Sequence, residues 1–352
     1  MILMPKKDVM TTTISQRAFL PDLLRGVAVV LMVQVHLTEL FANESWFNSL
    51  GGQLSLFFGG APAAPLFMIF MGFFAGKQKK ACKKLFFRGL KFLAYGLLLN
   101  IGLNFHLFFK IFIHGYQVDP LPYLFGVDIF FLAGISLMII ALFKIVFKKS
   151  ILLWSFLFLV LAFLNPFLSS SAGLPDPMKY LQAFFYGNYE WSYFPLFPWG
   201  AYPVAGVIGS LIAERWREKW WNERNQFLLF MMLLIVLLIS FPFGFSQTID
   251  LQSYYHHNGL LVLWNLVFVS SWVLLFGFLF SPESANSLTK WLVFAGRNVT
   301  AFYVFQWLWI GNLATLVYKS QFPLPLLIWF VCLILATHLC VKLQLSISAK
   351  LH

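Results

Sequence analysis

The stretch DLLRGVAVVLMVQVH, residues 22–36, combines an apolar run typical of a membrane-spanning helix with three ionisable side chains. At about 100° per residue, Arg25 and His36 lie within ~20° of each other around a helix, and Asp22 lies ~40° to the other side of His36. The three side chains therefore share one face. Ionisable groups inside a membrane-spanning segment are energetically costly, and they usually face a protein interior or a water-filled cavity. We expect this face to point inward.

The rest of the chain has the composition of a membrane protein. Of its 352 residues, 60% are hydrophobic and 11% are charged, and the mean hydropathy is +0.78. A soluble domain of this composition would have too little polar surface to face water. Repeated apolar runs of about 20 residues predict an all-α, polytopic membrane protein with a single domain over residues 1–352. The ten expected spans are 19–42, 54–76, 87–109, 121–144, 150–169, 195–213, 226–245, 258–281, 291–316 and 324–345.

The distribution of basic residues predicts the orientation. With both termini in the cytoplasm, the inner connections contain KQKKACKKLFFR, FKK and ERWREKWWNER. Of the 25 lysines and arginines, only Lys110, Lys179 and Lys319 fall on the outer side. This bias follows the positive-inside rule, so it explains most of the net charge of +12 without a nucleic-acid partner. We expect a multi-pass protein of the inner membrane, with its first span uncleaved because no small-residue cleavage site follows it.

Two further features bound the chemistry. Cys82, Cys332 and Cys340 form neither a disulfide framework nor a metal-binding spacing, so we expect no metal. The longest outer connection, 170–194, contains MKYLQAFFY, which is predicted to form a short interfacial helix. Its aromatic residues form either an ordinary interfacial belt or a platform for a sugar ring. The prolines of FPLFPWGAYP, which follows, free backbone groups near the outer face.

The ionisable residues of the first span allow two interpretations. Asp22 and Arg25 have the i,i+3 spacing of an ion pair that anchors the helix near the inner interface. His36 is either a core histidine bonded to a neighbouring helix or a general base. Glu39 lies one turn beyond His36, so it could orient an imidazole that takes a proton from a substrate.

An arginine, ten intervening residues and a histidine in a first span resemble the signature of the type-3 membrane acyltransferases. The wider pattern, including GGAPAAPLFMIFMGFFAG at 59–76, resembles the bacterial relatives of heparan-α-glucosaminide N-acetyltransferase. LFGVDIFFLAGISLMII, FPLFPWGAYPVAGVIGSLIAE and FAGRNVTAFYVFQWLW are similar, in order, to the family's fourth-, sixth- and ninth-span regions. The resemblance covers nearly the whole chain, and the first motif is its most specific part.

The resemblance implies an enzyme that takes an acyl group, most simply acetyl, from cytoplasmic acyl-CoA to a glycan acceptor of the cell envelope. The heparan branch has a histidine in its first lumenal loop that can be linked to an acyl-enzyme step. The corresponding loop here, 43–53, contains none. We therefore expect direct transfer, with His36 as general base and Arg25 positioning the donor or the helix.

The remaining candidates are expected around that reaction. Acceptor hydroxyls could be bound by His256 and His257, which begin the eighth span, or by Tyr303 and Gln306, which share one face of the ninth. Asp128, seven residues into the expected fourth span, is a further cavity candidate. For all of these, ordinary interfacial or interhelical hydrogen bonding is the alternative.

Three cations lie at cytoplasmic span ends, where donor phosphates would bind. Arg88, Lys91 and Arg297 could neutralise those phosphates, because such charge cannot enter hydrocarbon unpaired. The alternative is that they only set the topology.

Other functional classes stay open at the level of sequence. A transporter or flippase for a lipid-linked glycan would usually show symmetric halves, which this sequence lacks. A descendant that has lost catalysis, and a structural or sensory subunit, are further alternatives. The acceptor, the acyl chain, O- versus N-transfer and the oligomeric state are not predicted.

Overall fold

The computed structural model describes residues 7–78, 82–168, 175–220 and 222–351. These residues form helices and no β-sheet, with only two isolated bridges, Ala42 to Gln321 and Val127 to Ser192. Nine helical segments of the described chain are long and apolar enough to cross a membrane. The prediction of an all-α, polytopic membrane protein is therefore confirmed.

In chain order the helices are α1 (Lys7–Leu40), α2 (Glu44–Phe47), α3 (Leu50–Gly60), α4 (Ala63–Lys77), α5 (Cys82–Leu103), α6 (Phe105–His114), α7 (Leu121–Leu124), α8 (Ile129–Phe147), α9 (Ile151–Phe163), the 3₁₀ turn η1 (Asn165–Phe167), α10 (Asp176–Ala183), α11 (Leu196–Trp199), α12 (Ala201–Trp220), α13 (Glu223–Ile249), α14 (Leu251–Tyr255), α15 (Gly259–Leu279), α16 (Ser287–Arg297), α17 (Val299–Val317) and α18 (Pro323–Leu351).

The expected span at 150–169 is shorter than predicted. Its helix, α9, has 13 residues and is followed by the 3₁₀ turn η1, whose second residue is Pro166. At 1.5 Å per residue α9 rises about 20 Å, which is less than the ~30 Å of a hydrocarbon core. Apolar composition alone therefore overestimated the length of this segment.

Three other expected spans are interrupted by asparagine or extended backbone. The span expected at 87–109 ends at Leu103, and α6 starts after Asn104. The one expected at 291–316 divides at Asn298 into α16 and α17. The one expected at 121–144 consists of α7, a short extended link and α8. Asn100 supports that link, because its Nδ2 donates to the carbonyls of Leu124 and Gly126, both at 2.9 Å. Irregular backbone at membrane depth needs such protein partners.

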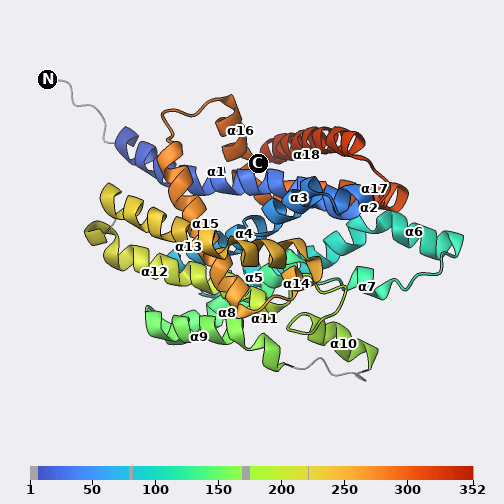
Figure 1. Cartoon of the computed structure of the whole chain (residues 1–352), viewed down its shortest axis with the longest axis horizontal. Helices are drawn as coiled ribbons and strands as arrows, with labels where there is room; N and C mark the ends of the chain where they lie inside the picture. The colour runs from blue at the N-terminus through green and yellow to red at the C-terminus, as the bar shows by residue number, and fades with distance from the viewer. Residues whose placement is uncertain (1–6, 79–81, 169–174, 221, 352) are drawn as a thin grey trace.

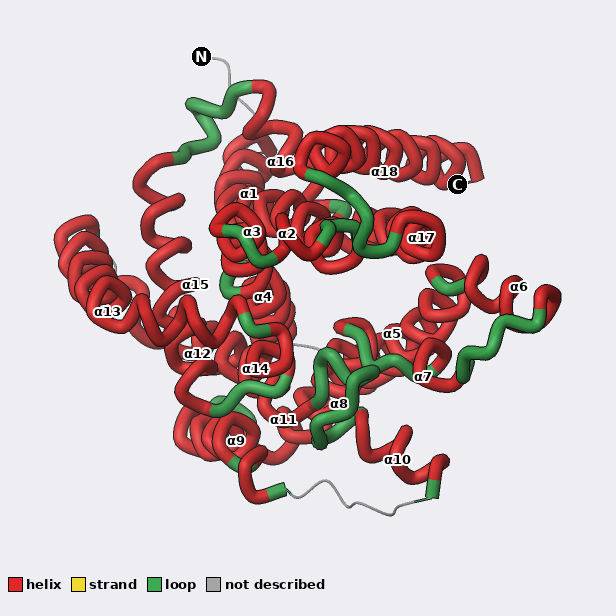
Figure 2. The backbone as a smooth tube through the Cα atoms, turned by 45° about the vertical axis from the view of Figure 1, so that its right-hand side comes forward, coloured by secondary structure: helices red, strands yellow, loops and turns green. Residues whose placement is uncertain are grey.

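The helices form an elongated bundle (Figure 1), and the side chains at its two ends differ. We call the end that carries Lys77, Lys149 and Arg215 the basic end. There Lys149 pairs with Glu214 at 2.5 Å. At the opposite end the chain after α17 returns to α1, where the Lys319 N–H donates to the Leu40 carbonyl. Figure 2 shows α13 and α6 at opposite edges of the molecule, and almost none of the apolar length of α13 is buried inside the protein. We expect α13 to face lipid.

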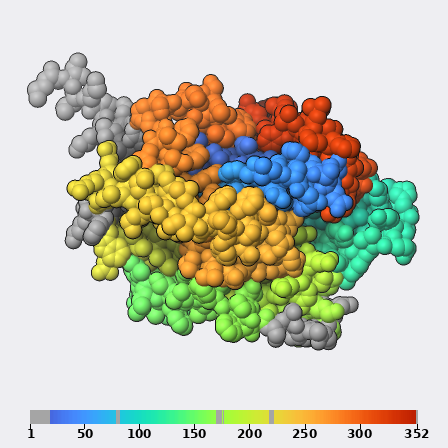
Figure 3. Space-filling model, viewed as in Figure 1, coloured from blue at the N-terminus to red at the C-terminus, as the bar shows by residue number. Residues whose placement is uncertain are grey.

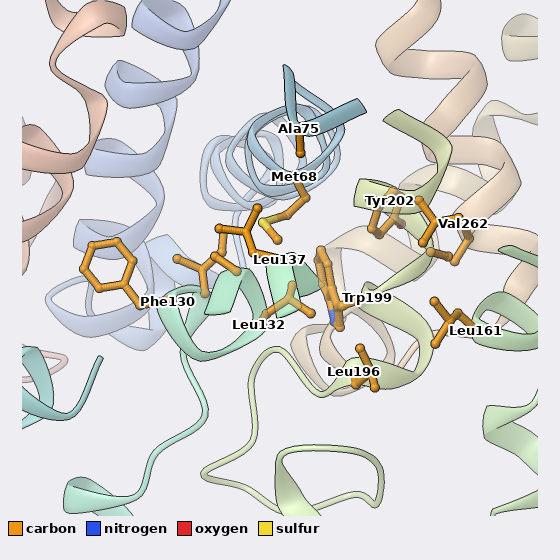
Figure 4. Close-up of a cluster of buried hydrophobic side chains, with 14 of the residues drawn as sticks. Met68, Ala75, Phe130, Leu132, Leu137, Leu161, Leu196, Trp199, Tyr202 and Val262 are labelled. Atoms are coloured by element: carbon orange, nitrogen blue, oxygen red, sulfur yellow. The ribbon is translucent and has the colours of Figure 1, made fainter. Parts of the chain in front are cut away.

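The main core lies where α4, α8 and α12 meet. Trp154, Trp199 and Tyr202 are fully buried there. Figure 4 shows side chains of α4 and α8 converging on Trp199, among them Met68 and Leu132. Because α12 follows directly from α11, this packing also fixes the turn at residues 194–200.

Helix α1 is enclosed by other helices. Leu23, Leu24 and Val33 are completely buried, and only a small area of residues 19–40 is visible on the face shown in Figure 3. The backbones of α1 and α16 touch at two glycines. A Cβ added to Gly296 would lie 1.7 Å from the Asp22 carbonyl oxygen, and one added to Gly26 would lie 1.9 Å from that of Leu292. Small residues allow this close approach of membrane helices.

The contact between α1 and α16 leads to a prediction about stability. Gly296→Ala places a methyl group into the backbone of α1, so we expect it to destabilise the protein by about 1–3 kcal/mol or more and to lower the melting temperature in detergent. Gly277→Ala is the matched control, because the nearest atom to its added Cβ, Leu20 Cδ2, is 3.6 Å away. Equal melting temperatures of the two variants would contradict the proposed contact.

Candidate functional site

The imidazole of His36 is held by two consecutive residues of α17. Its ring packs against Trp307, with centroids 4.1 Å apart and an angle of 35° between the planes. Its Nδ1 lies 3.5 Å from Nε2 of Gln306, whose side chain is completely buried. Among the described residues, Oε1 of Gln306 has no hydrogen-bond partner.

Gln306 can determine which imidazole nitrogen is free. Rotation of its terminal amide by 180° brings Oε1 to Nδ1 of His36, and this oxygen can then accept the Nδ1–H. In that tautomer, Nε2 of His36 keeps its lone pair and can accept a proton. The sequence predicted Gln306 as an acceptor-binding residue, whereas its contact is with His36 itself.

Glu39 lies one turn further along α1, but its contact is with Tyr255 rather than with His36. The Tyr255 hydroxyl is 3.3 Å from both carboxylate oxygens, so it can donate to either of them. The orientation of His36 in this structure therefore comes from Gln306 and Trp307 and not from Glu39, which the sequence suggested.

Asp128 and Tyr303 form a second polar pair. The Tyr303 hydroxyl donates to Oδ2 of Asp128, and Oδ1 of Asp128 accepts the backbone N–H of Ile129 at 2.6 Å. Asp128 therefore caps the N-terminus of α8 instead of lying seven residues into a span. Tyr303 and Gln306 share one face of α17, which is the geometry that their i,i+3 spacing predicted.

Two cavities meet at these groups. The larger has a volume of about 600 Å³ and the smaller about 40 Å³. Five residues line both cavities: His36, Glu39, Asp128, Phe194 and Tyr255. The larger cavity extends toward the opposite end of the bundle, where Lys110 and Tyr318 line it. The smaller one extends in the direction of the basic end as far as Met32 and Phe67.

Several residues of the larger cavity were not singled out from the sequence. They come from five separate parts of the chain: Asn100, Asn104, Lys110, Tyr116, Tyr123, Tyr193, Trp307 and Tyr318. Asn100 and Asn104 gave a signal, because two amides four residues apart in an apolar run share a helix face. Tyr193 belongs to the aromatic outer connection that the sequence suggested as a sugar platform. The other tyrosines gave no signal, since interfacial tyrosine is common in membrane proteins.

The predicted ion pair of α1, Asp22 and Arg25, lies at the basic end, several helical turns away from His36. Oδ1 of Asp22 is 3.4 Å from Nη1 of Arg25, and its Oδ2 is 3.1 Å from Nε of Arg297. The Arg25 guanidinium also lies over the rings of Phe70 and Phe74, at 5.4 Å and 4.7 Å from their centroids. Asp22 thus has a second cationic partner that sequence spacing did not indicate. At 1.5 Å per residue His36 is ~16 Å further along α1 than Arg25, so the four predicted catalytic residues divide into two sites.

The other predicted cations are accessible. Arg88 is exposed beside the ring of Phe92, and it is close enough to Arg25 for their charges to repel. Lys91 is exposed one turn further along α5. The side chain of Arg297 is 55% exposed although it pairs with Asp22. The basic end therefore presents two arginines paired with Asp22 and a third, Arg88, close to Arg25.

His257 belongs to a buried hydrogen-bond chain. Asn265 Nδ2 donates to the Tyr202 hydroxyl at 2.7 Å, and that hydroxyl lies 3.0 Å from Nε2 of His257. Nδ1 of His257 lies 2.6 Å from the Tyr254 carbonyl oxygen and must carry the proton, since a carbonyl oxygen only accepts hydrogen bonds. His257 is 2% exposed and lines neither cavity, and neither does the half-buried His256. This arrangement places both histidines away from the acceptor-binding role that the sequence suggested.

The aromatic residues of the outer connection mostly pack on one another. Trp191 lies between Tyr180 and Tyr189, with ring centroids 5.1 Å and 4.9 Å apart. The predicted interfacial helix corresponds to α10, and residues 170–174 lie outside the described part of the chain. Of the described residues of this segment, Tyr193 and Phe194 line the two cavities described above. In the described residues, no group of three or more His, Cys, Asp or Glu side chains could hold a metal ion.

A polytopic helical protein with a histidine between two cavities is the class that these observations define. A family model described as an acyltransferase domain, of the type-3 family, matches residues 20–343. The match covers nearly the whole chain, so the protein belongs to the type-3 acyltransferase family. It is therefore a membrane acyltransferase by family, as the first-span motif predicted. The comparison does not separate out the heparan-α-glucosaminide branch. No curated protein and no solved structure matches the chain significantly.

The buried chain around His257 predicts a pH dependence of stability. Burial lowers the pKa of His257 to about 4 in the folded protein, against about 6.5 for an unfolded chain. The neutral imidazole therefore stabilises the fold fully above pH ~6.5, and about 3 kcal/mol is lost as the pH falls toward 4. His257→Gln should flatten this part of the stability curve, measured as melting temperature in detergent between pH ~7 and ~4.5.

The exposed His114 is the matched control for this measurement. His114→Gln should keep the wild-type pH dependence. If the melting temperature of His257→Gln depends on pH as strongly as that of wild type, other groups cause this pH dependence.

Proposed function

We propose that this protein transfers an acetyl group from acyl-CoA at the basic end to a sugar of the cell envelope at the opposite end. The observation that carries the proposal is that His36 and Glu39 line both cavities at their junction. A donor and an acceptor that enter from opposite ends would meet there. The first-span motif favours the bacterial relatives of heparan-α-glucosaminide N-acetyltransferase as the nearest branch, and the distribution of basic residues favours the inner membrane.

The proposed reaction is a direct transfer. An acceptor hydroxyl or amine attacks the thioester carbonyl carbon and gives its proton to Nε2 of His36. The new C–O or C–N bond forms as the C–S bond breaks, and the leaving thiolate takes the proton from the imidazolium. The products are the acylated acceptor and free CoA, so atoms and charge balance without a covalent enzyme intermediate. Loop 43–53 contains no histidine that could carry such an intermediate.

The basic end suits an anionic donor. Arg25 and Arg297 pair with Asp22, and Arg88 lies close to Arg25, so the group has a positive balance. Guanidinium groups bind phosphate through charge-assisted, often bidentate hydrogen bonds. Arg25 is the least exposed of the three and is held by Asp22 and two phenylalanines. We assign it to positioning the donor, and we assign the more exposed Arg88 and Arg297, with Lys91, to the phosphates.

The larger cavity suits a sugar acceptor. Its lining combines the faces of Trp307 and several tyrosines with the amides of Asn100 and Asn104 and the ammonium of Lys110. Flat aromatic faces pack against pyranose rings, while amides and hydroxyls bind sugar hydroxyl groups. A volume of about 600 Å³ falls within the usual range for small-molecule sites.

The assignment of His36 is tested by substitution and acyl transfer. His36→Ala and His36→Gln should both reduce transfer by ~10²–10⁴-fold, because a positioned base typically contributes this factor. Gln306→Leu should reduce it less, through loss of the favoured tautomer. The assay follows labelled acetyl from acetyl-CoA in proteoliposomes, with cell-envelope glycan as acceptor, and folding is checked by melting temperature.

His106→Gln is the matched control for His36→Gln. His106 is also half-buried, and its Nδ1 is hydrogen-bonded to Thr315 of a neighbouring helix. It should retain transfer within a few-fold of wild type. A well-folded His36→Gln protein with wild-type turnover would refute the catalytic role and favour transport of a lipid-linked glycan instead.

The donor site is tested by binding. Arg88→Gln should weaken acetyl-CoA binding by roughly 10–100-fold, since a charge-assisted contact contributes about 1.5–3 kcal/mol. Arg297→Gln should act similarly, although it also frees Asp22. Lys319→Gln, at the opposite end, is the control and should leave donor binding unchanged. Unchanged binding in both arginine variants would reduce these residues to topology signals.

A further inference from the structure

One wall of the small cavity beside His36 is formed by residues with little or no side chain. The break between α3 and α4 brings Gly59, Gly60, Ala63 and Ala64 to it, and Met32 of α1 closes another side. Its volume is about 40 Å³, against about 600 Å³ for the larger cavity. The small cavity therefore suits a group of few non-hydrogen atoms, such as the acetyl group.

Three of the hydroxyl groups around this cavity already have partners within the protein. The Tyr254 hydroxyl donates to the Gly60 carbonyl and the Thr248 hydroxyl to the Gly244 carbonyl, both at 2.7 Å. The Tyr303 hydroxyl donates to Asp128. With these hydroxyls occupied, the part of the small cavity away from the junction, lined by Met32, Leu56 and Phe67, is apolar and suited to a methyl group rather than to a sugar hydroxyl.

The walls have little freedom to move outward. A Cβ added to Gly59 would lie 2.1 Å from Val35 Cβ, and one added to Gly60 would lie 2.8 Å from Thr248 Cγ2. Met32 is 5% exposed and Leu56 is 2% exposed. Because well-packed interiors resist even one additional methylene, a longer acyl chain would have to displace these side chains.

We infer that the small cavity is the acyl site and that Met32 limits the donor to a short acyl chain, acetyl in preference to propionyl or butyryl. This inference rests on the proposed function. The acetyl methyl lies in the small cavity, and the carbonyl carbon lies at the junction, beside His36 and Glu39. Its thioester bond is the one that breaks when the acceptor oxygen or nitrogen forms its bond to this carbon, and the proton passes through His36 to the thiolate.

Met32→Ala and Met68→Ala form a matched pair for the test. Both methionines are buried in the same core, Met32 at 5% and Met68 at 2% exposure, but only Met32 lines the small cavity. Each substitution removes the same atoms, so the loss of stability should be comparable. Transfer is measured in proteoliposomes with acetyl-, propionyl- and butyryl-CoA, and the readout is the ratio of kcat/KM between donors.

The expected outcomes differ clearly between the two variants. Wild type should prefer acetyl over propionyl by ~10–200-fold, the usual range for one methylene in a fitted pocket. Met32→Ala should raise the butyryl-to-acetyl ratio by about tenfold or more, whereas Met68→Ala should leave it at the wild-type value. Ala64→Leu, which adds a larger side chain to the wall of the small cavity, should lose acetyl transfer while keeping acetyl-CoA binding.

Failure of this inference is distinguishable from failure of the proposed function. Acetyl transfer with the same donor ratio in wild type, Met32→Ala and Met68→Ala would overturn the acyl site and leave the acyltransferase intact. Wild type that uses butyryl-CoA as well as acetyl-CoA would do the same. No transfer from any of the three donors by folded wild-type protein would overturn the proposed function, and the acyl site with it.

Discussion

The structure depends on one constraint: α1 carries Asp22, Arg25, His36 and Glu39 through a region where lipid cannot solvate them. The protein meets this constraint by enclosing α1 among other helices. The glycine contact between α1 and α16 brings the two backbones together, and it is beside this contact that Asp22 meets Arg297. Packing and ion pairing therefore depend on each other here, because a wider separation of the helices would also leave the carboxylate with one partner fewer.

The same enclosure divides α1 into two chemical environments. At the basic end, Arg25 and Arg297 pair with Asp22, and nearer the opposite end His36 and Glu39 face cavities. The helix breaks lie around these environments. Asn298 separates α16 from α17, and the link before α8 ends at Asp128, which lines both cavities. Backbone groups freed by such breaks are tolerated where protein or a cavity covers them, so the interruptions coincide with the places where chemistry is proposed.

Burial separates the histidines into different roles. His257 has both ring nitrogens bonded within the protein and lines neither cavity, so it stabilises the junction of α12, α14 and α15. His36 has one ring nitrogen facing Gln306 and lines both cavities, so its other nitrogen is available to a substrate. A histidine that is fully bonded holds a fold, and one that is bonded on one side only can exchange a proton.

The sequence by itself determined the membrane class, the helical architecture and the inward face of the first span, because apolar length and helical periodicity are local properties. It also indicated the type-3 acyltransferase family, which the family match shows. The sequence overestimated the length of α9 and missed the helix breaks at Asn104, Asn298 and residues 125–128. Hydropathy does not register how an amide side chain competes for backbone hydrogen bonds or how a proline removes one. Only the tertiary structure decided that His36 meets Gln306, that Glu39 meets Tyr255, that Asp22 meets Arg297 and that His257 is turned away from the cavities. Apart from His257, whose two partners are Tyr202 and Tyr254, these contacts join residues more than 200 positions apart, and no sequence spacing specifies them: they follow from which helices pack side by side.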